Sequence, residues 1–320
     1  MNRFQLTASA LALTVTSVAL GASSTASAAS GMGRPATYQL QGDPGGSKFE
    51  GIGVSTNGST FYISEVTGGE LHRGDVRSGE MTEWQPEGAD GRFTARGITT
   101  DAEGRIYVAG GPNGIGTGRP DLWVYAPDGT LLAALRTGVD NAFLNDVTIG
   151  PDGAAYFTNS NAPQIFRVAV DGGAWRVTTW TDATGTIATA AGFNLGGIVV
   201  APNRRSLVVA QGNVGVLWRF DLATRAATRI NADADLRNAD GLVLGGTTLR
   251  VVRNFDQILT TLRLTPDARS AELVRTDHTD PTRVFTTAKM AQGRLLLVDS
   301  KFDEAIAAPP YEVVAFKLPH

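Results

Sequence analysis

Cysteine is absent from all 320 residues, so the chain can form neither disulfide bonds nor thiolate metal sites. Histidine occurs only at His72, His278 and His320, which are too scattered to indicate a zinc site. Long amphipathic helical patterns are also missing. A formal net charge of −3 gives no electrostatic reason to expect nucleic acid or an anionic membrane as a partner. The chain must therefore rely on its apolar core, and any metal chemistry would use oxygen ligands.

The sequence is rich in turn residues and in apolar residues. It contains 38 glycines and 14 prolines, and 42% of its residues are hydrophobic. Period-two alternation around tight turns is typical of β-hairpins, as in AFLNDVTIGPDGAAYFTNS (142–160), where a Pro-Asp-Gly turn separates two apolar strands. This composition predicts an all-β chain with enough apolar residues for a large core.

The N-terminus has the pattern of a secretory signal peptide. Arg3 supplies a positive charge, residues 11–20 form an apolar stretch, and Ala26-Ser27-Ala28 offers a small-residue cleavage site. A membrane anchor is less well supported, because the apolar run is short and contains polar residues. We therefore predict a signal peptide over residues 1–28, a secreted protein without a membrane segment after cleavage, and one domain over 29–320.

Internal repetition is the strongest signal in the chain. Six segments share a head residue, a short apolar strand, a turn and a second apolar strand, and they recur about every 44 to 51 residues. Their heads are Glu50, Arg96, Asn145, Gly196, Asp240 and Thr286. The period leaves room for two more strands, which 121–127 and 130–136 supply in the second repeat. Four strands in each of six repeats predict a six-bladed β-propeller.

The two ends of the chain predict how this ring closes. The last repeat has strands near 294–298 and 311–317, and it lacks a fourth. ATYQLQG (36–42) precedes the first head residue and belongs to no other repeat. We expect this N-terminal strand to complete the last blade, which would remove an open sheet edge.

The head residues predict a site at the centre of the ring. The first strand of each propeller blade lines the central channel, so Glu50, Asn145 and Asp240 would converge there. Carboxylate and amide oxygens suit calcium or another divalent cation. Alternatively, polar heads could simply hydrate the mouth of the channel. Carboxylates gathered in a tunnel need a counter-ion, which favours the metal.

The period and the EGI, LND and ADG heads resemble the regucalcin and gluconolactonase family (the senescence marker protein family) of calcium-dependent hydrolases. Diisopropyl fluorophosphatase and paraoxonase are more distant relatives. The resemblance covers about residues 36–318. It implies that Glu50, Asn145 and Asp240 bind one calcium ion.

Two positions depart from the family pattern. Gly196 stands where the family has a fourth-blade asparagine, and Asn194 could replace it only if the strand start is shifted. Phe143 stands where sugar-lactone members have an arginine, so a more apolar lactone or ester is expected. We predict Arg96, Phe143 and Asn194 as substrate-binding residues. Arg96 could instead pair with Glu50 across the channel.

We predict a secreted, monomeric protein, and the resemblance implies a calcium-dependent lactonase or esterase that acts on a small molecule. The metal would polarise the substrate carbonyl, and Asp240 would act as general base or nucleophile. The alternative is a secreted, non-catalytic propeller that binds a ligand or a protein at its loop-rich face. The two departures from the family pattern favour this second interpretation.

Overall fold

Alternation of apolar and polar residues around tight turns builds antiparallel hairpins along the chain. A computed structural model describes residues 34–111 and 119–318. The regular elements in these ranges are strands, apart from the short 3-10 helix η1 (Ala89–Gly91). Among these residues no helix is long and apolar enough to cross a membrane. The predicted signal peptide, residues 1–28, lies outside the described residues.

The strands form six small sheets, and in each the strands pair in antiparallel order outward from the first. Blade one comprises β2 (Phe49–Val54), β3 (Thr60–Glu65), β4 (Leu71–Asp75) and β5 (Met81–Gln85). Blade two comprises β6 (Ile98–Thr100), β7 (Ile106–Ala109), β8 (Leu122–Tyr125) and β9 (Leu131–Leu135). Blade three comprises β10 (Leu144–Ile149), β11 (Ala155–Asn159), β12 (Gln164–Asp171) and β13 (Ala174–Asp182). Blade four comprises β14 (Leu195–Val200), β15 (Ser206–Gln211), β16 (Val216–Asp221) and β17 (Ala227–Arg229). Blade five comprises β19 (Ala239–Gly245), β20 (Thr248–Arg253), β21 (Ile258–Leu264) and β22 (Ser270–His278), and β18 (Asn231–Ala232) pairs in parallel with β22. Blade six comprises β23 (Phe285–Ala291), β24 (Arg294–Asp299), β25 (Tyr311–Phe316) and β1 (Thr37–Leu40).

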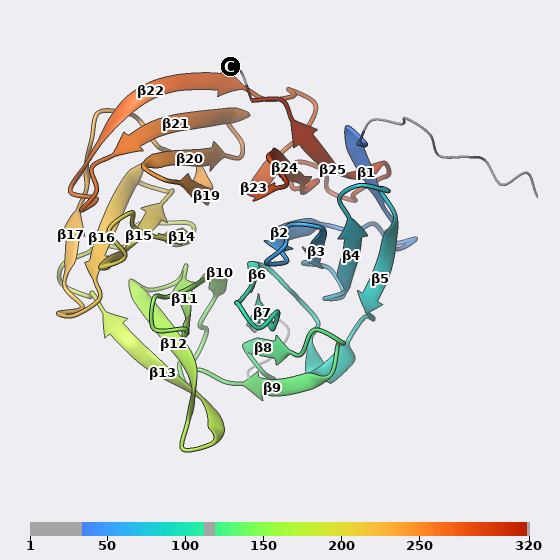
Figure 1. Ribbon diagram of the computed structural model, residues 1–320, viewed down its shortest axis with the longest axis horizontal. Helices are drawn as coiled ribbons and strands as arrows, with labels where there is room; N and C mark the ends of the chain where they lie inside the picture. Colours follow the sequence, from blue (N-terminus) through green and yellow to red (C-terminus); the bar gives the residue numbers. More distant parts are fainter. Residues whose placement is uncertain (1–33, 112–118, 319–320) are drawn as a thin grey trace, which may run out of the picture. The chain divides into compact units, whose positions relative to one another are not determined.

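The six sheets lie in a ring with their first strands, β2, β6, β10, β14, β19 and β23, toward the centre (Figure 1). Each of these strands contacts the first strands of the neighbouring blades. The prediction of an all-β, six-bladed propeller with four-stranded blades is therefore confirmed, with β18 as an extra strand at the edge of blade five.

The ring closes through the N-terminal strand, as the sequence predicts. β1 pairs antiparallel with β25, from Thr37 opposite Val314 to Leu40 opposite Tyr311. Tyr38 is fully buried at this seam, where it packs edge-on against Phe61 of blade one at 4.9 Å between ring centroids. The outer edge of blade six is thus filled by residues from the opposite end of the chain.

The first strands have an irregularity that directs their head residues. In five of the six blades the pairing with the second strand shifts register at the head, for example between Phe49 and Ile52 and between Ala239 and Leu242. Such a bulge changes the direction in which a side chain points. Four heads are followed by glycine, and a Cβ on Gly51 or Gly197 would overlap the backbone of the next blade. The recurring head-glycine pair therefore reflects close packing of inner strands around the axis.

The apolar core lies between neighbouring blades. One cluster joins Val208 and Leu217 of blade four to Leu249 and Leu262 of blade five, all with no exposed surface. Another joins blade one to blade six at the seam. Burial of apolar surface at about 25 cal/mol per Å² makes these contacts the main stabilising contribution to the ring. The result is a rigid frame for the head residues.

Candidate functional site

A cavity of about 470 Å³ lies at the head-residue end of the inner strands. Every blade contributes to its walls. All six residues predicted from the sequence to form the site line it: Glu50, Arg96, Phe143, Asn145, Asn194 and Asp240. The fold therefore brings together residues that are up to 190 positions apart, as the repeat predicts.

Glu50 and Asp240 are the two carboxylates of the cavity. Glu50 is 7% exposed, and its buried Oε2 atom has no hydrogen-bond partner. Burial raises the pKa of Glu50 well above its ordinary value, and the Asp240 carboxylate raises it further, against a smaller opposing effect of Arg96. Burial also raises the pKa of Asp240 to about 7. The two acids thus share a space in which both cannot ionise easily without a cation.

Asn145 and Gly196 define a space beside these carboxylates. A Cβ added to Gly196 would lie 3.6 Å from Oδ1 of Asn145 and 3.9 Å from Oδ1 of Asp240, with no closer neighbour. Two oxygens from blades three and five therefore approach one point above the Gly196 backbone. The missing side chain at position 196 leaves room there for a water molecule or a ligand atom.

Arg96 and Phe143 form one wall of the cavity. The Arg96 guanidinium lies over the Phe143 ring at 3.6 Å, and Phe193 packs on Phe143 at 4.9 Å between centroids. Nη1 of Arg96 donates to the carbonyls of Gly110 (2.6 Å) and Leu144 (3.2 Å), whereas Nη2 has no partner. Burial lowers the pKa of Arg96 to about 10, and the charge of Glu50 opposes this shift.

The predicted alternative, an ion pair between Arg96 and Glu50, is not formed within 4.0 Å among the described residues. Their charges still interact, because each shifts the pKa of the other. Arg96 therefore presents a buried guanidinium nitrogen without a partner, which is suited to an anionic or carbonyl oxygen.

Asn194 lines the cavity, but its amide is fully engaged in hydrogen bonds to its own loop and to residues of blades three and four. Oδ1 accepts hydrogen bonds from the Ala190 backbone, Gln211 and Asn213. Nδ2 donates to three carbonyl oxygens, those of Ser160, Ala190 and Gly192. The substrate-binding role of Asn194 stays a prediction, and its hydrogen bonds describe a residue that holds the loop before β14.

Two further residues shape the site, and the repeat pattern of the sequence did not predict them. Asn254, at the end of β20, donates from Nδ2 to Oδ2 of Asp240 at 2.9 Å. Asp146 takes the place of the head-following glycine in blade three, and its carboxylate accepts the amides of Val147 and Ile198 at 2.8 and 3.1 Å. The unusual Asn-Asp pair at 145–146 is a signal that could have singled out Asp146.

The donor set fits a hard divalent cation. It combines two carboxylates with an amide oxygen, contains a buried carboxylate oxygen without a partner, and leaves free volume above Gly196. Calcium accepts such oxygens in flexible geometry and completes its coordination with water. The same residues could also bind and orient a carbonyl-containing ligand through the unpartnered nitrogen of Arg96.

Comparison with solved structures finds similar folds in two enzymes and in a calcium-binding protein. Regucalcin from Agrobacterium tumefaciens, a calcium-binding protein, is 16% identical, with 89% of this chain and 94% of that chain aligned at a TM-score of 0.62. A gluconolactonase from Xanthomonas campestris is 16% identical over 85% and 87% at 0.57. Virginiamycin B lyase from Staphylococcus aureus is 15% identical over 82% and 81% at 0.58.

These identities show a shared fold. No family model matches the chain. No curated protein matches it either. The resemblance to regucalcin and gluconolactonase that the head motifs predict is confirmed in the structural comparison, since both proteins align over most of their length.

Proposed function

We propose that this protein is a calcium-dependent hydrolase of lactones or esters, with its active site in the central cavity. The observation that carries the proposal is Oε2 of Glu50, a buried carboxylate oxygen without a partner, in a cavity that Asp240 also lines and where the two carboxylates repel each other. Such an atom is expensive to bury unless a ligand completes its environment. The alignment with a calcium-binding regucalcin and a gluconolactonase supports the same choice of metal and reaction.

Glu50, Asn145 and Asp240 would hold the ion, which supplies polarisation of the substrate carbonyl. Asp240 accepts a proton from water as the water oxygen bonds to the acyl carbon. The bond between that carbon and the alkoxy oxygen then breaks, and the proton passes from Asp240 to the departing oxygen. Burial raises the pKa of Asp240 to about 7 in the metal-free cavity, and calcium would lower it by stabilising the carboxylate, so Asp240 would be ionised and able to accept a proton at neutral pH.

The walls of the cavity support an apolar substrate. Phe143, Phe193, Phe255 and Phe302 all line it, and Phe193 and Phe255 are 61% and 54% exposed. Exposed aromatic rings at a cavity mouth gain most from covering by apolar groups. We propose aliphatic or aromatic lactones and esters as the substrate class, with Arg96 oriented toward the carbonyl or carboxylate end.

Hydrolysis of a panel of lactones and aryl esters, with and without a chelator, tests the proposal. Turnover should require added calcium, and Asp240→Asn should abolish it while the protein still melts cooperatively. Asp90→Asn is a matched control, because Asp90 is an exposed acid outside the cavity. Calcium-independent turnover, or full activity of Asp240→Asn, would disprove the mechanism.

A non-catalytic ligand-binding propeller is the second candidate. Gly196 offers no side chain to a metal, and the amide of Asn194 is occupied by hydrogen bonds to other protein groups, so the site has fewer free donors than the family pattern. Calcium or ligand binding that raises the melting temperature, with no turnover on the panel, would favour it. Secretion and a monomeric state remain part of the proposal, and N-terminal sequencing and sedimentation of the exported protein test them.

A further inference from the structure

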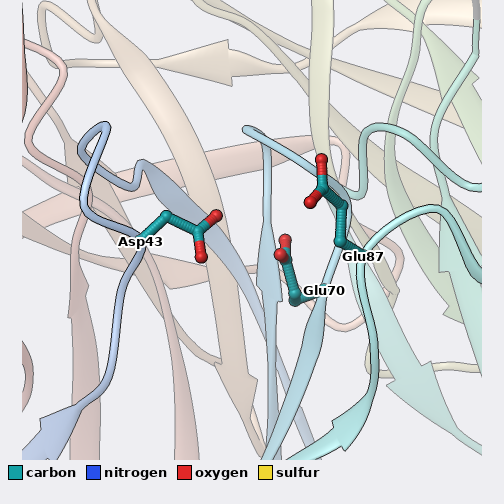
Figure 2. Close-up of side chains that lie close together, drawn as sticks. All are labelled: Asp43, Glu70 and Glu87. Atoms are coloured by element: carbon teal, nitrogen blue, oxygen red, sulfur yellow. The ribbon is translucent and has the colours of Figure 1, made fainter.

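Three carboxylates from separate loops meet at the seam of the ring, away from the central cavity. Asp43 follows β1, Glu70 precedes β4, and Glu87 follows β5. One oxygen of each lies within 4.8 Å of the others, and Figure 2 shows the Glu70 side chain between Asp43 and Glu87. None of the three lines the central cavity. The cluster is therefore distinct from the site formed by Glu50, Asn145 and Asp240.

Glu70 gives this cluster a feature that ordinary surface acids lack. The residue is only 5% exposed, and its Oε2 atom is buried without a hydrogen-bond partner. Burial raises the pKa of Glu70 to about 7, and the carboxylates of Glu65, Asp43 and Glu87 add to the shift. A buried carboxylate next to other acids is unfavourable unless a cation offsets the repulsion.

No positive side chain in the described part of the chain forms an ion pair with this cluster. Arg92 is the cation that acts on Glu70, but its guanidinium donates to the carbonyls of Gly69 (2.5 Å) and Pro86 (3.3 Å) and to the Tyr125 hydroxyl. Within residues 34–111 and 119–318, none of the three acids belongs to an ion pair.

The backbone around Glu70 leaves space for its carboxylate. Gly68 has a φ of +68° and lies directly beside Glu70, where an added Cβ would meet Oε1 at 2.9 Å and Oε2 at 2.5 Å. A side chain at position 68 would therefore displace the carboxylate from the cluster. The loop 66–70 thus places a buried acid close to two exposed acids from other loops, and calcium binds such carboxylate oxygens.

We propose that Asp43, Glu70 and Glu87 bind a second hard divalent cation, with calcium as the physiological candidate. Asp43 lies in the loop after the strand that completes blade six, whereas Glu70 and Glu87 belong to blade one. A bound ion would therefore link the first and last blades at the point where the ring closes. Its role is to stabilise the closed ring, and it is independent of the chemistry proposed for the central cavity.

Calcium titration calorimetry on the full chain, after removal of metal with a chelator, tests this site. Glu70→Gln should lose one calcium site that the parent protein has, and the exposed-residue variants Asp43→Asn and Glu87→Gln should weaken the same site by about tenfold or more. Glu83→Gln is the matched control, because Glu83 is an exposed acid of β5 outside the cluster. Equal stoichiometry and affinity in the parent protein and all three cluster variants would disprove the proposal.

Glu50→Gln separates the two sites. In this background the central site is weakened, so a rise in melting temperature on adding calcium reports on the seam site. The rise should persist in Glu50→Gln and disappear in the double variant Glu50→Gln/Glu70→Gln. Failure of the central site alone would leave the rise intact. A rise that survives in the double variant, or no rise in Glu50→Gln, would overturn the seam site.

Discussion

Asn254 donates a hydrogen bond from Nδ2 to Oδ2 of Asp240 at 2.9 Å. The contact joins the end of the second strand of blade five to the head of its first strand. It occupies one oxygen of the carboxylate and leaves Oδ1 beside the space above Gly196. Because the bond stabilises the ionised carboxylate, it also lowers the pKa of Asp240 against the larger effect of burial. Asn254 thereby orients the Asp240 carboxylate and affects the basicity of this proposed general base.

Asn254→Ala should raise the pKa of Asp240, because the ionised form loses a donor while its burial is retained. The acidic limb of the pH–rate profile for hydrolysis should move to higher pH by up to about one unit. Asn57→Ala, in an exposed turn of blade one, is the control. An unchanged limb in Asn254→Ala would show that a group other than Asp240 titrates in the profile.

Gly196→Asn should strengthen calcium binding in the channel by about tenfold or more, because an amide oxygen is added where Asn145 and Asp240 already converge. The backbone accepts a Cβ at this position, since its nearest neighbour would be 3.6 Å away. Calorimetry in a Glu70→Gln background would isolate the channel site. Gly197→Asn is the contrasting variant, since a Cβ there overlaps the Asp240 carbonyl and should destabilise the fold. Weaker binding in Gly196→Asn would contradict the assigned geometry.

The raised pKa of Asp240 predicts how stability depends on pH in the metal-free protein. Its value of about 7 in the fold exceeds the ordinary 3.8, so the folded state binds more protons than the unfolded state between these values. The contribution of Asp240 to stability is therefore fully present below about pH 4, and it is lost as pH rises toward and through 7, by on the order of 4 kcal/mol. Denaturant titrations at several pH values in a chelator would measure the fall.

The loss of stability with rising pH should be smaller in Asp240→Asn, because the carboxyl group that loses its proton is absent. Added calcium should also reduce it, since the ion stabilises the ionised carboxylates. A parent protein whose stability rises steadily from pH 5 to 8 without metal would contradict the prediction. Glu50 contributes in the same direction, because its pKa is raised as well.

Substitution of Tyr38 tests how much the closure of the ring by β1 contributes to stability. Its ring is fully buried between blades six and one, and its hydroxyl donates to the Val76 carbonyl and accepts a bond from Arg294, both at 2.8 Å. Tyr38→Ala should lower the free energy of unfolding by about 3 to 5 kcal/mol, and Tyr38→Phe by about 1 kcal/mol. Urea denaturation measures both. A neutral Tyr38→Ala would mean that β1 adds nothing to closure.

The sequence predicted the parts of this molecule that repeat. Six heads at a regular spacing predicted six blades, and the unmatched strand at 36–42 predicted the pairing of β1 with β25. Glu50, Asn145 and Asp240 were found together for the same reason, because equivalent positions in a closed ring must meet at its axis. The period of the repeat was therefore enough to predict the fold and the residues at the centre of the site.

Residues outside the period could not be predicted in this way. Asn254 reaches Asp240 from another strand of its blade, and no spacing rule identifies the contact. Asn194 was predicted as a substrate-binding residue, yet both polar atoms of its amide are engaged in hydrogen bonds to other protein groups. The acids of the seam belong to three loops with no shared motif, and only the folded ring brings Glu70 between its neighbours.

Phe143 tests the proposed choice of substrate. Its ring packs against both the Arg96 guanidinium and Phe193. It can therefore both supply apolar surface to a substrate and orient the guanidinium. Phe143→Ala should raise KM for apolar lactones about tenfold, because an aromatic contact is worth 1 to 2 kcal/mol, and should change kcat less. Phe143→Leu keeps apolar surface but loses the stacking on Arg96.

Comparison of the two variants separates the two roles of the ring. If Phe143 acts through apolar contact with substrate, Phe143→Leu should recover most of the lost affinity for aliphatic esters. If it acts by orienting Arg96, the leucine variant should resemble Phe143→Ala, and both should lose preference for substrates with an anionic group. Unchanged KM in both variants would remove Phe143 from the substrate site, and the same comparison with dissociation constants applies if the protein binds its ligand without turnover.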